Sequence, residues 1–317
     1  MGNENPSFND ILTASFNNHR EGFVNCIMNN NAFFMMLDKY GMTRELDGGV
    51  AIVEPLMFNT STAVGSYSGS DILDVSVQNA LTAAKFVWKQ IHCPISIDGI
   101  TEFQNAGKSR RIELIQAYMT QAETSLNVYT NKVLFGDGSG NGGKDITGLL
   151  AAVEEGTVWS TYGDIDSNLF PVWRNAWATV GSFATNGIDK MKSMYNTVSQ
   201  GPKNPNLIIT TQAIYEYYEK TVSNVYRTMD LKTANIGFTN LVFKNCPIIF
   251  DDDCTSGYMY FIMSEFFKMV YGKGKKMTLT PFQTPHNQDI RVASMFAYLQ
   301  LVCNHRRRQG VLTGITA

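Results

Sequence analysis

One long alternating segment near the C-terminus constrains the fold of this chain more than any other feature. From Arg291 to Cys303 every second residue would lie on one face of a strand, and after Arg291 that face is apolar throughout. Alternation with a period of two over about a dozen residues is typical of a strand with one buried face, and it is about twice the usual strand length. The sequence therefore predicts a sheet that contains one unusually long strand. The chain then closes with the basic run Arg306, Arg307 and Arg308, followed by QGVLTGI.

A second clear pattern, between Lys108 and Phe135, has the period of a helix. Apolar residues recur there at steps of three and four, which places them on one face of an amphipathic helix. At about 1.5 Å per residue this helix would run roughly 40 Å. The stripe lasts only about three heptads and includes Ala122 and Tyr129, so we expect it to pack against a sheet and not in a coiled coil. Its members are Ile112, Ile115, Met119, Ala122, Leu126, Tyr129 and Val133.

The composition favours a chain whose surface is largely covered by neighbours. Of the 317 residues 44% are hydrophobic, with 14 Tyr, 19 Phe and 15 Met. Only 17% are charged, against about a quarter in average globular proteins, which favours large association interfaces. The net charge of −2 provides no global attraction to nucleic acid.

Signals for export or membrane insertion are absent from the sequence. No apolar run approaches the roughly 20 residues that a helix needs to cross a bilayer, so no membrane association is predicted. The five cysteines are scattered, odd in number and never spaced as CxxC. This pattern indicates reduced thiols in a cytosolic setting.

The remaining patterns divide the chain into segments of different character. Residues 1–48 hold short helical patterns without the length of a domain, which predicts an arm that packs on something else. Residues 49–100 form two β limbs joined by a bend rich in Gly and Ser. Because two limbs alone are marginal in water, this excursion either folds back on its own domain or lies on a partner surface. Residues 148–272 alternate helical and strand patterns, so the fold class is α+β.

The Gly-rich segment Gly138–Lys144 is a candidate for a nucleotide site. It satisfies the GxxxxGK part of a phosphate-binding loop, but Asp145 stands where Ser or Thr is required, and its carboxylate would repel phosphate. The segment also follows a predicted helix, whereas the motif requires a preceding strand. We interpret it as a turn between two parts of the chain. A nucleotide-binding enzyme that uses this loop is a minor alternative.

No other pattern predicts catalysis, a cofactor or a metal. The four histidines show no ligand spacing, and no GxSxG nucleophile motif is present. The acidic run Asp251–Asp253 lies between two strand-like runs and is expected to face water in a turn. The sequence therefore predicts a protein that is not an enzyme, with no cofactor and no metal site.

Three stretches carry a resemblance to a known family. KDITGLLAAV (144–153), FTNLVFKNCPIIFDDDC (238–254) and the ending from Leu279 resemble the major capsid proteins of tailed bacteriophages. The order of the segments also resembles the Hong Kong 97-like fold of those proteins, so the likeness covers nearly the whole chain. It implies an α+β Hong Kong 97-like major capsid fold with an N-terminal arm, an extended β loop, a peripheral domain with a long spine helix, and an axial domain.

The resemblance implies a place in this fold for each segment. Residues 1–48 would be the N-terminal arm, and 49–100 the extended loop that lies over a neighbouring subunit. Residues 101–147 would form the peripheral domain with its spine helix. Residues 148–272 would form the axial domain at the centre of each capsomer, and 273–317 would return to the peripheral domain as its closing strands.

The resemblance also implies a function. The chain would be a major capsid protein that assembles with itself as hexamers and pentamers into an icosahedral shell around phage double-stranded DNA. It would reside in the virion capsid after assembly in the host cytoplasm. Because the chain begins almost at the arm, we expect a separate scaffold protein, besides the portal, as a partner. A nanocompartment shell protein of the same fold, which packages enzymes, is the alternative.

Six residues are candidates for contacts between subunits by this resemblance. A bare run of three arginines more often forms a solvated turn, but the likeness of the ending favours subunit contacts. The second limb of the β excursion supplies the other three candidates. The six are Arg306, Arg307, Arg308, Lys85, Trp88 and Lys89.

Overall fold

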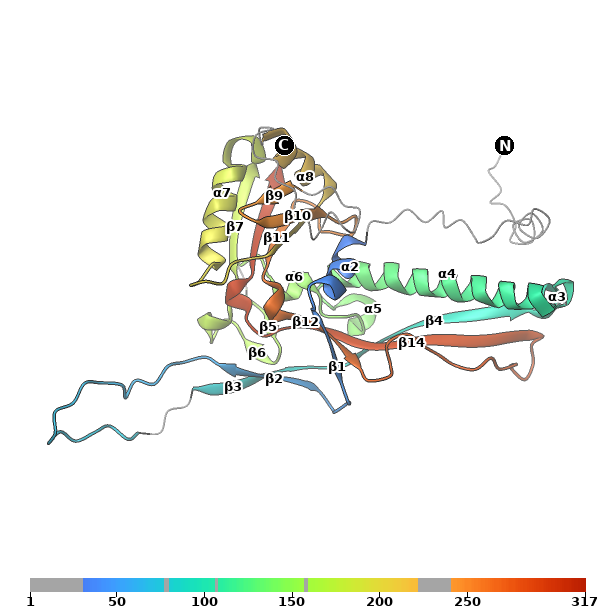
Figure 1. The fold of residues 1–317 in the computed structure, drawn as a ribbon, viewed down its shortest axis with the longest axis horizontal. Coiled ribbons are helices and arrows are strands. Elements are labelled where there is room, and N and C mark those ends of the chain that lie inside the picture. The colour runs from blue at the N-terminus through green and yellow to red at the C-terminus, as the bar shows by residue number, and fades with distance from the viewer. Residues whose placement is uncertain (1–30, 77–79, 106–107, 157–158, 222–240) are drawn as a thin grey trace.

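The computed structural model describes residues 31–317 apart from 77–79, 106–107, 157–158 and 222–240. Figure 1 shows three parts: a body in which helices pack on a mixed sheet, an extension in which one long helix lies along a second sheet, and a hairpin that projects in the opposite direction. The mixture of helices and sheets confirms the predicted α+β class.

The extension is built on a five-stranded sheet around the long C-terminal strand. Its strands are β1 (Thr43–Leu46), β4 (Lys89–Asp98), β12 (Phe267–Gly272), β13 (Thr278–Leu279) and β14 (Ile290–Cys303). Strand β14 pairs antiparallel with β4, β12 and β13, and β1 runs parallel to β12. The predicted long strand is confirmed, because the alternate residues from Ala293 to Cys303 are all buried. Gln300 and Val302 are buried as well, so both faces of β14 are covered where it enters the body.

Helix α4 (Lys108–Leu134) lies along this sheet, preceded by the short helix α3 (Gly99–Gln104) (Figure 1). It packs on β4, as predicted from its apolar stripe. Ala122, Leu126 and Val133 of that stripe are buried. Tyr129 departs from the pattern: its side chain is exposed, and its hydroxyl donates a hydrogen bond to Asp145 Oδ1 at 2.8 Å.

The body is built on a six-stranded sheet of mixed direction. In order across the sheet its strands are β7 (Ala176–Ser182), β15 (Gly310–Thr316), β11 (Met259–Ile262), β8 (Leu207–Thr210), β10 (Cys246–Phe250) and β9 (Leu241–Phe243). Helix α7 (Phe183–Val198) packs on β7 and β15, and α8 (Gln212–Thr221) packs on β10. All four residues of the central strand β8 are buried, as expected for a strand with both faces covered.

Short elements connect these layers. The projecting hairpin consists of β2 (Ile52–Met57) and β3 (Leu81–Phe86). The other connecting elements are α2 (Ala32–Lys39), α5 (Gly140–Gly143), α6 (Leu149–Ala152), β5 (Thr161–Tyr162), β6 (Ile165–Asp166) and the 3-10 turns η1 (Pro171–Trp173), η3 (Ser264–Phe266) and η4 (Arg306–Arg308).

The two sheets depart from the predicted segment boundaries in three places. The last strand, β15, lies in the six-stranded sheet with β7 and β11, and not with the closing strands that precede it. Strand β4, at the end of the predicted β excursion, and β12, at the end of the predicted mixed segment, both pair with β14. The alternation and length of a segment predict a strand, but they do not predict which other strand it pairs with. The extended part of 49–100 is therefore only the hairpin and its loop.

Gly148 lies where the chain leaves the Gly-rich segment, and it has no space for a side chain. A Cβ atom there would be 2.3 Å from the carbonyl oxygen of Leu134 and 2.7 Å from that of Gly136. Because the obstructing atoms belong to the backbone, we expect Gly148→Ala to lower the free energy of unfolding by about 1–3 kcal/mol. Urea unfolding measures this loss, with Gly65→Ala as the control because nothing lies within 4 Å of a Cβ at that position. Equal stability of the two variants would contradict the steric explanation.

Candidate assembly surfaces

The hairpin is anchored at its root and uncovered at its outer end. The root of the hairpin is its paired part, strands β2 and β3, which runs from Ile52 opposite Phe86 to Met57 opposite Leu81. Ile52 and Phe86 are buried, and the Phe86 ring lies 5.1 Å from the ring of Tyr162. Beyond Phe58, whose ring contacts the ring of Phe170, the chain runs away from the body before it returns (Figure 1). The two alternatives for the β excursion therefore apply to different parts, since the root packs on its own domain and the outer part does not.

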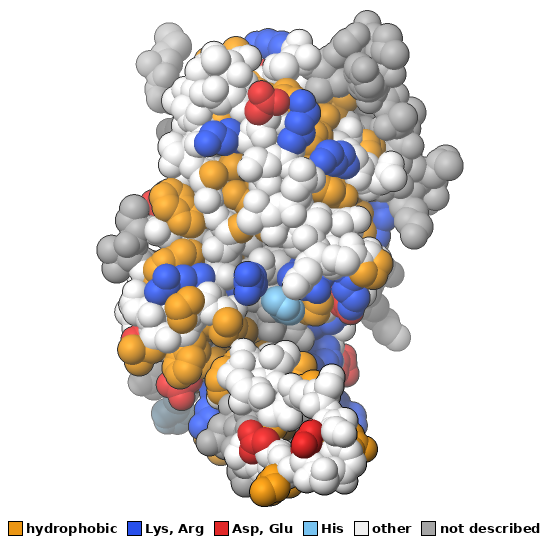
Figure 2. All heavy atoms as spheres, turned by 90° about the vertical axis from the view of Figure 1, so that its left-hand side faces the viewer, with side chains coloured by type: hydrophobic (Ala, Val, Ile, Leu, Met, Phe, Trp, Pro, Cys, Tyr) orange, Lys and Arg blue, Asp and Glu red, His pale blue; other side chains and the backbone are white. Residues whose placement is uncertain are grey.

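Large apolar side chains are exposed along the outer part of the hairpin. The exposed fraction is 101% for Ile72, 88% for Val75 and 84% for Val64. Figure 2 views the molecule from the side to which the hairpin points, and apolar side chains are spread over this face of the molecule. Contiguous apolar surface on a soluble protein usually marks a contact site, and a two-stranded hairpin alone is marginal in water. The outer hairpin is thus the strongest candidate for a contact with another chain.

The three candidate residues near the hairpin have different surroundings. Lys85 on β3 is exposed. Trp88 is half-buried, and its indole Nε1 donates a hydrogen bond to the carbonyl oxygen of Gly49 at 3.0 Å. Lys89 donates from its ammonium group to the carbonyl oxygen of Gly143. Trp88 and Lys89 therefore hold parts of their own chain together, and Lys85 alone of these three has an exposed side chain.

The Gly-rich segment does not have the geometry of a phosphate-binding loop. It follows helix α4 directly, and Asn141, Gly142 and Gly143 all have positive φ angles, which gives an irregular turn. The carboxylate of Asp145 lies against the segment, because a Cβ on Gly140 would meet its Oδ2 at 2.2 Å. A negative charge in this place opposes phosphate binding, which supports the interpretation of the segment as a turn.

The requirements of a metal site and of a membrane-spanning helix can also be compared with the described part of the chain. No three His, Cys, Asp or Glu side chains among the described residues are grouped so that they could hold a metal ion. Among those same residues no helix is both long and apolar enough to cross a bilayer.

Arg306 is fully buried, which corrects its prediction as a contact between subunits. Its Nε donates to the carbonyl oxygen of Ala152 at 2.8 Å, and its Nη1 donates to Ser167 Oγ at 2.7 Å. Its Nη2 lies 3.0 Å from Glu154 Oε2 and forms an ion pair with it. A guanidinium with five donors in a planar fork suits several acceptors at once. Arg306 therefore fastens the turn between the two sheets to α6 and the segments that follow it.

The other two arginines of η4 lie nearer the surface. Arg308 is half-buried, with its guanidinium 5.5 Å from the ring centre of Phe266 and Nη1 3.3 Å from the carbonyl oxygen of Gln200. Arg307 is exposed. Of the three arginines, only Arg307 is exposed and so open to a neighbouring subunit. This division could not be predicted from the sequence, because three identical adjacent residues carry no information about which one is buried.

Asp251 is also buried, so the prediction that the acidic run faces water is wrong for its first residue. One carboxylate oxygen accepts the backbone N–H of Phe33 at 2.8 Å, and the other accepts Asn131 Nδ2 at 2.8 Å and the N–H of Asp253 at 3.0 Å. Asn131 Oδ1 accepts the N–H of Phe34 at 3.2 Å. Side chains from α4 and from the turn after β10 therefore cap the first turn of α2, whose own N-cap residue makes no side-chain hydrogen bond.

Replacing Asp251 by asparagine should destabilise this cap in a pH-dependent way. Burial raises the pKa of Asp251 to about 6, against the opposing effect of its hydrogen bonds. Because this pKa is raised in the folded protein, protonated Asp251 adds to the free energy of unfolding. That addition is complete below about pH 4 and is lost as the pH rises through about 6. In Asp251→Asn the NH2 group of the new amide would face one of the N–H groups that the carboxylate accepts, so that hydrogen bond would be lost. We expect the free energy of unfolding to fall by about 1–3 kcal/mol at pH 4 and by less at pH 7.5.

Denaturant unfolding of both proteins at the two pH values measures this difference. Asp189→Asn is the control, because the Asp189 carboxylate is 84% exposed and pairs only with a surface lysine. A loss that is independent of pH, or one that grows between pH 4 and pH 7.5, would contradict the account of Asp251.

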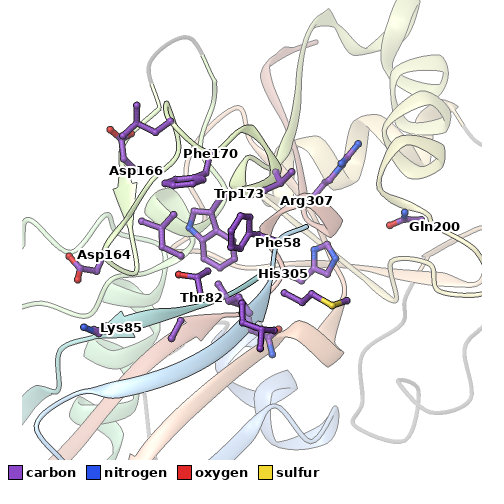
Figure 3. Close-up of a pocket in the computed structure, with 18 residues that line it drawn as sticks. Phe58, Thr82, Lys85, Asp164, Asp166, Phe170, Trp173, Gln200, His305 and Arg307 are labelled. Atoms are coloured by element: carbon purple, nitrogen blue, oxygen red, sulfur yellow. The ribbon is translucent and has the colours of Figure 1, made fainter. Parts of the chain in front are cut away.

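A groove of about 800 Å3 opens between the hairpin root and the body (Figure 3). Its walls come from β2 and β3, from the turn between β5 and β6, from η1 and from η4. Lys85 and Arg307, two of the predicted contact residues, both line it although they are far apart in the sequence. Figure 3 shows Phe58, Phe170 and Trp173 in the middle, Asp164 and Asp166 on one side, and His305 and Arg307 on the other.

Comparisons with known proteins identify the fold. No family model matches this sequence, and no curated protein matches it either. Among solved structures, a chain of the cyanophage A-1(L) capsid is 17% identical, with a TM-score of 0.70 over 95% of this chain and 98% of that one. A chain of the native GTA particle capsid is 10% identical, with a TM-score of 0.67 over 94% of each chain.

An encapsulin chain shares the fold less closely. A chain of the SrpI encapsulin complex from Synechococcus elongatus is 11% identical, with a TM-score of 0.55 over 96% of this chain and 95% of that one. The matches extend over nearly the full length of each chain, so the likeness concerns the whole architecture and not one layer of it. The chain has the Hong Kong 97-like fold of tailed-phage major capsid proteins, as the resemblance of its sequence implied.

Proposed function

We propose that this chain is a major capsid protein that assembles as hexamers and pentamers into an icosahedral shell. The observation that carries the proposal is the hairpin, which projects from a capsid-type fold with its apolar side chains uncovered. At roughly 25 cal/mol per Å2 of apolar surface, even modest contacts accumulate when each subunit touches several others. Such a protein acts through repeated burial of surface and requires no catalytic group.

The parts of the fold have corresponding places in the proposed shell. The five-stranded sheet with α4 would be the peripheral domain, and the six-stranded sheet with α7 and α8 would be the axial domain near the centre of each capsomer. The hairpin of β2 and β3 would be the extended loop that lies over a neighbour. The predicted arm, 1–48, falls largely outside the described residues, and its described end includes α2.

The expected surroundings follow from this function. The shell would enclose phage double-stranded DNA, in the virion, after assembly in the host cytoplasm. With a net charge of −2 each subunit would contribute little to DNA binding, so the genome would be held by enclosure and by nonspecific contacts. A scaffold protein and a portal would be the other assembly partners.

The likeness to an encapsulin chain favours a second candidate, a nanocompartment shell that packages enzymes. The contents of assembled particles separate the two functions. Particles purified from infected or expressing cells with the portal and packaging proteins present should hold nuclease-protected double-stranded DNA. Particles that hold a single co-purified enzyme and no protected DNA would overturn the phage function and establish the nanocompartment.

A further inference from the structure

The groove at the hairpin root leaves apolar side chains without cover. Leu169, Phe170 and Val172 in its wall are 74%, 44% and 43% exposed. The Phe58 ring meets the Phe170 ring edge to face at 6.1 Å, so the end of the hairpin root contacts the body within the groove. Its volume of about 800 Å3 is enough for a short peptide segment with several apolar side chains.

The end of this groove at η4 is electropositive. His305 and Arg307 line it on the side away from the two aspartates (Figure 3). Burial lowers the pKa of His305, and the charges of Arg308, Arg307 and Lys203 lower it further, so these cations act on one place. Lys203 is neutralised by an ion pair with Glu265, whereas Arg307 makes no hydrogen bond or ion pair with any residue that the structure describes. This end of the groove is therefore suited to bind an acidic group.

The outer end of the hairpin has the complementary character. The segment Asp71–Val75 combines two acids with three exposed apolar residues: Ile72 and Val75 are almost fully exposed, and Leu73 is 55% exposed. Both of its carboxylates, on Asp71 and Asp74, are at the surface. Hydrogen bonds from Ser76 lower the pKa of Asp74, so this group is ionised at neutral pH. Figure 2 shows basic side chains and a histidine across the middle of the face, and acidic side chains on the part below it.

We propose that the groove of one copy receives the segment Asp71–Val75 of a second copy, with its apolar side chains against Phe170 and an aspartate facing Arg307. This inference rests on the proposed function and specifies where the hairpin of a neighbour docks. A chain does not fill its own groove, because its hairpin carries the segment away from the body (Figure 1). Segment and groove are different surfaces of the molecule, so the contact is head-to-tail, and repetition around an axis closes a ring.

Charge reversal tests the polar part of this contact. Arg307→Glu and Asp74→Arg should each reduce the yield of capsomers and shells about tenfold or more, because each places like charges together. The double variant should recover most of that yield. The matched control is Lys192→Glu, since Lys192 is exposed on α7 outside the groove. Single reversals that assemble like the wild type, or a double variant as defective as the singles, would overturn the docking.

A disulfide between copies tests the apolar part independently. Ile72→Cys together with Leu169→Cys should give intermolecular crosslinks on oxidation, visible as a ladder of dimers and larger rings without reductant. Ile72→Cys with Ser193→Cys, on the exposed side of α7 outside the groove, should give few. Equal crosslinking of the two pairs would overturn the docking. If wild-type particles form while these tests fail, the docking is wrong and the capsid function stands; if wild-type particles never form, the proposed function itself is overturned.

Discussion

Replacing Arg306 by alanine is expected to lower the free energy of unfolding by about 3–5 kcal/mol. The substitution leaves the Glu154 carboxylate and the carbonyl oxygen of Ala152 without their buried donor, and it opens a cavity beside the Tyr162 ring, which lies 4.9 Å from the guanidinium. Native proteins are stable by only about 5–15 kcal/mol, so this loss would remove a large fraction of the total free energy of unfolding. Urea unfolding followed by circular dichroism measures the loss.

Two further substitutions show whether the loss of stability in Arg306→Ala is caused by the contacts of this side chain or by the loss of a positive charge. Arg307→Ala removes an exposed guanidinium from the same turn and should change the free energy of unfolding by less than about 0.5 kcal/mol. Arg306→Lys keeps the charge but not the planar fork, so it should be nearly as harmful as alanine. If Arg306→Ala and Arg307→Ala are equally stable, the structural role of Arg306 is wrong.

Deleting Ala63 to Asp71 is expected to abolish closed shells while the subunit still folds. The deletion leaves β2, β3 and their anchored root intact, and it removes a loop that buries little of its own apolar surface. Each 1.4 kcal/mol of lost contact free energy lowers an association constant about tenfold, so a loss repeated at every junction should leave soluble capsomers or monomers. Sedimentation velocity and electron microscopy measure the products, and thermal unfolding checks the fold.

A replacement of the same length separates the two properties of this loop. If 63–71 is exchanged for a Gly and Ser sequence, the reach of the hairpin is retained and its apolar side chains are lost. We expect assembly to fail here too, because burial of the exposed side chains of Val64 and Tyr67 adds to the contact that Asp71–Val75 makes. Intact shells from the deletion variant would refute the hairpin as a clamp between subunits.

The sequence predicted the elements whose signals are local and long. Alternation from Arg291 to Cys303 and the apolar stripe of α4 each persist over many residues, and both are present as predicted. Burial of one face of a helix or strand requires apolar residues at a regular spacing, and this spacing can be read from the sequence alone. The short stretches that resemble capsid proteins pointed to the fold that the full chain shares with solved capsid structures.

The sequence did not predict features that depend on contacts between distant residues. Arg306 is buried because Glu154 and Ser167 meet it, and Asp251 is buried because Asn131 and α2 cover it. Strand β15 joins β7 and β11 by a register that no local pattern encodes. Composition alone ranks arginine and aspartate as surface residues, so only knowledge of the partners reverses that expectation. The groove likewise exists only because the hairpin root, η1 and η4 meet in space.

Electron microscopy of the purified protein, alone and coexpressed with any scaffold protein encoded beside its gene, shows whether this chain forms a shell. We expect closed icosahedral shells, or rings of five and six subunits, under at least one of these conditions. A reconstruction of such particles should show the hairpin of each subunit lying on its neighbour. Persistent monomers under both conditions would contradict the claim that this chain is a shell-forming capsid protein.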